Sequence, residues 1–96
     1  MSKARRFRLV ADVSTHNPTG LRPVLEELVD GTVTAAEDGF HVEGTMAGEN
    51  ARDLNRMLLS ALRRVERRTR LRAVWTSGET TERFFDYVPK RGRLTG

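Results

Sequence analysis

His41 and Glu43, two residues apart, are the side chains in this sequence best placed for acid–base chemistry. In an extended segment residues i and i+2 face the same side, and Asp12 belongs to another extended segment that can lie beside them. An imidazole between carboxylates can transfer a proton or bind a metal ion. The same arrangement also serves as an ordinary cross-strand pair on a sheet. We adopt that interpretation and expect no catalytic residue, no metal ligand and no enzymatic activity.

The arginine residues are the second feature of the sequence that could support a function. The chain has 15 arginines against two lysines, and four of them recur at helical spacing. Such a row of guanidinium groups can neutralise the phosphates of a nucleic acid, but a solvated helix face in an arginine-rich sequence has the same pattern. Weak, non-specific nucleic-acid binding, aided by a basic arm from Lys3 to Arg8, is therefore the alternative function. The row consists of Arg52, Arg56, Arg63 and Arg67.

Several other kinds of site are excluded or disfavoured by the residues present. The chain has no cysteine, which removes disulfides, thiol catalysis and thiolate metal sites. Its glycines are scattered, and no glycine-rich loop leads from a strand into a helix as a phosphate cradle requires. His16 lies among turn-forming residues without an adjacent nucleophile and base. We expect no bound cofactor.

The length and charge of the chain limit its domain organisation and its location. Ninety-six residues form one domain, which we expect over residues 6–89, with a disordered basic arm (1–5) and a disordered tail (90–96). No apolar run exceeds three residues and no signal peptide is visible, so we expect no membrane partner and a cytoplasmic location. The net charge of +4 hides a charge of −6 over residues 9–48 and +5 over residues 49–72.

The elements that must position these side chains follow from the apolar spacing. Residues 7–13 alternate as a strand, and apolar residues at helical spacing predict a short helix over about 21–30, with Pro23 in its first turn and Gly31 as its end. Asp38-Gly39 predicts a tight hairpin between strands 32–37 and 40–46. In this register Ala35 lies opposite Val42 and Thr34 opposite Glu43, and the core side of the hairpin carries Val33, Ala35, Phe40 and Val42.

The second half of the chain repeats the pattern. Asn50 followed by Asp53 predicts a helix start, and a core-facing stripe follows. Residues 70–76 then alternate as a strand, with Leu71, Ala73 and Trp75 inward. Residues 80–88 form either a fifth strand after a turn at Gly78-Glu79 or a short helix, and sheet-forming residues favour the strand. The helix stripe consists of Leu54, Leu58, Ala61, Leu62 and Val65.

The order strand, helix, hairpin, helix, strand resembles the ferredoxin-like split βαβ superfold over about residues 6–77, an α+β sandwich with an antiparallel sheet. This resemblance implies that both helices cover one side of the sheet and that the other side is open. Exposed aromatic residues, on which RNA-binding domains of this shape stack bases, are missing there. We expect a binding domain that pairs through this open face with a second copy of itself or with another protein. The residues of that face are Arg8, Val10, Asp12, Thr34, His41, Glu43, Arg72 and Val74.

Overall fold

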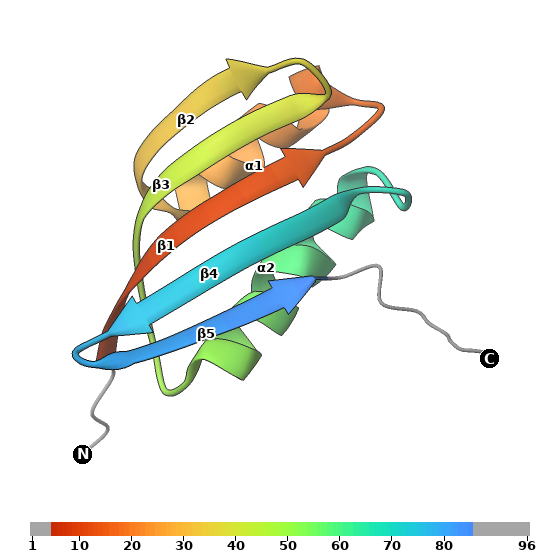
Figure 1. The fold of residues 1–96 in the computed structure, drawn as a ribbon. Coiled ribbons are helices and arrows are strands. Elements are labelled where there is room, and N and C mark those ends of the chain that lie inside the picture. Colours follow the sequence, from red (N-terminus) through yellow and green to blue (C-terminus); the bar gives the residue numbers. More distant parts are fainter. Residues whose placement is uncertain (1–4, 86–96) are drawn as a thin grey trace, which may run out of the picture.

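The computed structural model describes residues 5–85, which form one five-stranded antiparallel sheet and two helices (Figure 1). The strand order is β2-β3-β1-β4-β5, and both helices lie on the same side of the sheet, as Figure 1 shows. The α+β class and the fifth strand are confirmed. The elements in chain order are β1 (Arg5–Ser14), α1 (Pro18–Leu28), β2 (Asp30–Ala36), β3 (Gly39–Gly48), α2 (Ala51–Val65), β4 (Arg70–Ser77) and β5 (Thr80–Phe85).

The core lies between the sheet and the helices, and strand alternation determines which residues enter it. On β1 every second side chain from Phe7 to Val13 is buried, and β4 buries its alternate residues in the same way. Trp75 of β4 is fully buried, and its indole Nε1–H donates to Oδ1 of Asn55 on α2 at 3.1 Å. This bond satisfies the indole inside the core. Sequence reasoning missed it, because Asn55 is polar and lies beside the predicted apolar stripe.

Both helices begin at asparagine caps. The Asn50 side chain accepts from the backbone N–H of Asp53 at 2.8 Å, as predicted. At α1 the Asn17 side chain accepts from the backbone N–H of Gly20 at 3.1 Å, so this helix begins at Pro18, earlier than predicted. Pro23 therefore lies inside the helix and not in its first turn. The helix also ends before Gly31, because the chain is already extended at Val29.

The hairpin between β2 and β3 differs from the predicted register. Ala36 pairs with Gly39, so the turn consists of residues 37–38, and Thr34 lies opposite His41. Glycine at position 39 is needed for the contact between β3 and β1 and not for the turn, because a Cβ on it would lie 1.9 Å from the carbonyl oxygen of Val13 in β1. The glycine allows β3 to approach β1 and has no positive φ. The slip of two residues leaves every side chain on its predicted face.

The second hairpin has the predicted turn. Ser77 pairs with Thr80, and Gly78 between them has φ +62. Glycine adopts this conformation without the steric cost that other residues meet. Residues 80–85 pair with β4 as the fifth strand, so the helical alternative is wrong there. Residues 86–88, which we expected to continue the strand, lie outside the described residues.

Three further expectations need correction or lie beyond the described range. Ala35 is exposed, whereas Val33, two residues earlier on the same edge strand, is buried. Val65 is 39% exposed because α2 ends there. Arg5 belongs to β1 and not to an arm, whereas the arm and tail expected at residues 1–4 and 90–96 lie outside the described residues. Neither helix within residues 5–85 combines the length and apolarity needed to cross a membrane.

Candidate functional site

The open face of the sheet consists of the strand residues whose side chains point away from the helices. All eight residues predicted for it alternate with buried core residues, and each is exposed or half-buried. Within the described residues no helix or loop lies over this face, as Figure 1 shows from the open side. It is therefore a broad surface that no other part of residues 5–85 covers. The eight residues are Arg8, Val10, Asp12, Thr34, His41, Glu43, Arg72 and Val74.

Strand pairing arranges these residues in rows across the sheet, with β1 at the centre. Val10 on β1 lies between Glu43 on β3 and Val74 on β4. The two valines are direct cross-strand neighbours and both are half-buried. They form a small apolar centre, and the polar residues of the face surround it.

His41 is held between two carboxylates on the open face. Its Nδ1 lies 2.9 Å from Oδ1 of Asp12 on β1, and its Nε2 lies 2.9 Å from Oε2 of Glu43 on its own strand. When the ring is protonated, both N–H groups donate to carboxylate oxygens. Hydrogen bonds to Asp12 and then to Glu43 are the main reasons why the pKa of His41 is raised above its usual 6.5.

The three residues that sequence spacing suggested for chemistry are therefore brought together, as a cluster of one imidazole between two carboxylates. Both ring nitrogens of His41 lie within hydrogen-bond distance of a carboxylate oxygen. Among residues 5–85 no group of three or more histidine, aspartate and glutamate side chains is arranged to hold a metal.

No family model, no curated protein and no solved structure matches this chain.

The charged residues of the open face are unevenly distributed over its strands. Two of its carboxylates, Asp12 and Glu43, lie on β1 and β3, whereas Arg72 and Arg83 lie on β4 and β5. Asp30 on β2 is a third carboxylate on the β1–β3 side, and Arg6, Arg8 and His41 are cationic groups on the same side. The carboxylates of the face therefore all lie on the β1–β3 side, which is mixed in charge, whereas the charged residues described on the β4–β5 side of the face are arginines, and the valine pair lies between the two sides.

The arginine row on α2 is shorter than predicted. Arg52, Arg56 and Arg63 are exposed on the helix, but Arg67 follows its end at Val65. Arg63 also turns back, because its Nε donates to the backbone carbonyl of Thr69 at 3.0 Å. Four evenly spaced guanidinium groups along one helix are therefore not present.

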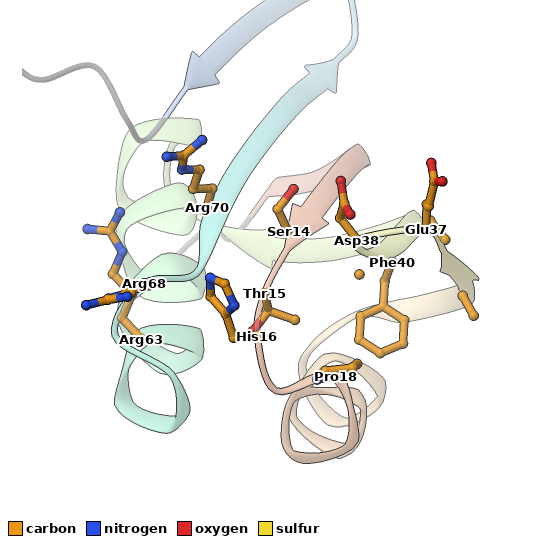
Figure 2. Close-up of a pocket in the computed structure, with 13 residues that line it drawn as sticks. Ser14, Thr15, His16, Pro18, Glu37, Asp38, Phe40, Arg63, Arg68 and Arg70 are labelled. Atoms are coloured by element: carbon orange, nitrogen blue, oxygen red, sulfur yellow. The ribbon is translucent and has the colours of Figure 1, made fainter.

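Sequence reasoning missed a cavity of about 890 Å³ at one end of the sheet. Arg63, Arg68 and Arg70 lie on one side of it, and Glu37 and Asp38 on the other (Figure 2). Residues 14–16, which follow β1, lie between them. The individual segments were visible in the sequence as a turn-rich loop and an arginine-rich run. Their proximity depends on the pairing of Ser14 with Arg70, which unites β1 and β4.

Proposed function

We propose that this protein is a non-enzymatic interaction domain that forms a homodimer through its open sheet face. The observation that carries the proposal is the unequal placement of charge around Val10 and Val74: all carboxylates of this face lie on the β1–β3 side, whereas the β4–β5 side carries arginines. A surface of this kind is complementary to itself, because a two-fold axis brings each side over the opposite side of a second copy.

The strand register indicates where that axis would lie. A two-fold axis that lies between β1 and β4 and runs parallel to them places Val10 of each copy over Val74 of the other copy. In the same row Glu43 meets Arg83 of the second copy, and in the next row Asp12, which already lies opposite Arg72 of its own chain, also meets Arg72 of the second copy. Sheets pack face to face about 10 Å apart with their strands within about 30° of parallel, a spacing that arginine and glutamate side chains can bridge.

The area of the face sets the expected affinity. Five strands about 4.8 Å apart, each paired over several residues of about 3.3 Å, make a face of roughly 550 Å² before side-chain relief is counted. A typical stable interface buries about 800 Å² on each partner. The proposed contact is thus small and mixed in polarity, and we expect a dimer that forms at micromolar concentrations.

We also infer that the first four strands and both helices form a ferredoxin-like arrangement. Support comes from the strand order β2-β3-β1-β4, from antiparallel pairing throughout, and from helices on one side only. In this arrangement β5 extends the basic edge of the sheet and contributes Arg83 to the open face. Fold alone carries no function, so the dimer proposal rests on the face and not on this assignment.

The experiment is a light-scattering measurement of mass from low micromolar to near-millimolar protein. The wild type should change from monomer to dimer over this range. Val10→Lys should remain monomeric, because it puts an unpaired charge into the apolar centre of the contact. Met57→Lys is the matched control, since Met57 is 45% exposed on the opposite side of the molecule, and it should dimerise like the wild type. A wild type that remains monomeric throughout, or a Val10→Lys variant that dimerises normally, would reject the proposal.

A further inference from the structure

The cavity at the end of the sheet is a second site, separate from the open face. Three connections meet there: the β1–α1 loop, the β2–β3 turn and the loop between α2 and β4. We propose that this cavity binds a small phosphorylated organic molecule, with its phosphate against the arginines and its hydroxyl groups toward the acidic side.

The walls of the cavity are fixed to one another through Thr15. Its backbone N–H donates to the carbonyl oxygen of Asp38 at 2.9 Å, which joins the β1–α1 loop to the β2–β3 turn. Its hydroxyl accepts from the hydroxyl of Thr69 at 3.2 Å, which joins the same loop to the start of β4. Thr69 is fully buried. A site with walls already in place loses little freedom when a ligand binds.

The arginine side of the cavity has the chemistry of a phosphate site. Arg63 is oriented by the bond from its Nε to the Thr69 carbonyl. Arg68 and Arg70 are both exposed, and within residues 5–85 neither guanidinium forms an ion pair with a carboxylate. A phosphate monoester carries nearly two charges and three terminal oxygens, so it can accept from more than one guanidinium at a time. A carboxylate has only two oxygens and one charge.

The hydroxyl and imidazole groups of Ser14 and His16 lie between the two charged sides (Figure 2). They can donate to phosphate oxygens or to the body of the ligand. Glu37 and Asp38 are exposed on the far side, where carboxylates can accept from ligand hydroxyl or amino groups. They would repel a continuous phosphate backbone, which favours a small molecule with one phosphate end over a nucleic acid.

The test uses ribose 5-phosphate as the probe and titration calorimetry at low ionic strength. Inorganic phosphate and ribose serve as partial ligands, one for each side of the cavity. The Arg68→Gln/Arg70→Gln double variant removes two charges from the cavity, and Arg52→Gln/Arg56→Gln removes two from the exposed part of α2 as the matched control. Arg63 is left intact because it holds the Thr69 loop.

We expect ribose 5-phosphate to bind more tightly than inorganic phosphate, and ribose alone not to bind. The cavity variant should bind at least about tenfold more weakly, the factor expected for one lost charged hydrogen bond, whereas the control variant should bind like the wild type. Glu37→Gln should weaken ribose 5-phosphate but not inorganic phosphate. Absence of binding, or equal weakening by both double variants, would overturn the proposal, because equal weakening indicates diffuse attraction to a basic protein. Tighter binding of a single-stranded oligonucleotide than of ribose 5-phosphate would also overturn it.

Discussion

At the scale of single residues, His41 is the group whose behaviour the structure determines most directly. Sequence spacing predicted that His41 and Glu43 share a face and that Asp12 can be near. It could not predict that each carboxylate takes a different ring nitrogen, because this depends on the register of β1 against β3, where Asp12 lies opposite His41.

The first prediction concerns the pKa of His41. Titration of its imidazole signals by NMR should give a pKa above 6.5, because both neighbouring carboxylates favour the charged ring. Asp12→Asn should lower this pKa more than Glu43→Gln does, since the hydrogen bond to Asp12 is the largest cause of the shift. A His41 pKa at or below 6.5, or one that is insensitive to both substitutions, would contradict the cluster.

The same shift predicts how stability depends on pH. The folded-state pKa of His41 is raised. The contribution of this residue to the free energy of unfolding is therefore fully present below the unfolded-state pKa of about 6.5, and it is lost as pH rises through the folded-state pKa. Urea unfolding midpoints of the wild type should therefore decrease over this window. His41→Gln should remove that part of the decrease. An unchanged profile in this variant would show that the cluster does not contribute to stability.

Asn55 gives a residue-scale prediction inside the core. Asn55→Ala leaves the indole N–H of Trp75 buried without a partner, which should lower the free energy of unfolding by about 1–3 kcal/mol. Trp75 is the single tryptophan of the chain, so its fluorescence can follow urea unfolding. Ser60→Ala, at an exposed position of the same helix, serves as the control. A loss no larger than that of the control would show that the bond is unimportant.

At the scale of elements, the apolar spacing correctly predicted the faces of β1, β3, β4 and α2, because burial acts on every second or every third to fourth residue. It was less successful where elements end. Val65 fits the helical stripe but lies in the last turn of α2. There its Cγ1 packs against Gly20 of α1, so that a Cβ on Gly20 would lie 3.0 Å from this Cγ1. Spacing within one element carries no information about such an end.

Leu58 and Met57 test the helix assignment as neighbours with opposite environments. Leu58 is fully buried, whereas Met57 is 45% exposed. Leu58→Ala should lower the free energy of unfolding by about 2–5 kcal/mol, and Met57→Ala should change it by no more than about 0.5 kcal/mol. The measurement is chemical unfolding of both variants under the same conditions. Similar losses in the two would mean that the phase of α2 is wrong.

The hairpins show that one sequence signal can have two causes. Asp38-Gly39 and Gly78-Glu79 both resemble tight turns, but only Gly78 has a positive φ. Gly39 instead allows close approach of β3 to β1, and no pattern within the hairpin could reveal a contact with a third strand.

This difference predicts unequal costs for two alanine substitutions. Gly78→Ala meets no atom within 4 Å, so it should cost only the backbone penalty of about 1–2 kcal/mol. Gly39→Ala puts a methyl group against the Val13 carbonyl and should cost more, because a packed backbone must move. Thermal unfolding of both variants provides the comparison. A smaller loss for Gly39→Ala would contradict the β3–β1 register.

At the scale of the whole molecule, the order of elements was enough to predict an open sheet face and its residues. The gathering of arginines on the β4–β5 side of that face was not predicted, because it needs Arg83 on β5 next to Val74. The cavity was not predicted either, because it joins segments some fifty residues apart through the pairing of β1 with β4. Both features depend on neighbours across the sheet, which a single sequence does not specify.

The central claim is that two copies meet with the carboxylate-bearing β1–β3 side of one face over the arginine-bearing β4–β5 side of the other. Under the proposed axis, Glu43→Arg and Arg83→Glu should each prevent self-association, because each variant repels its own copy. A mixture of the two should associate, since every Glu43 and Arg83 position then faces the opposite charge. Arg56→Glu on the exposed face of α2 serves as the control and should leave the wild-type dimer intact.

Light scattering on the two variants, alone and mixed in equal amounts, is the most direct test. We predict monomers in each separate solution and dimers in the mixture, at concentrations where the wild type is dimeric. Dimers in both separate solutions, or a mixture that remains monomeric, would contradict the proposed dimer.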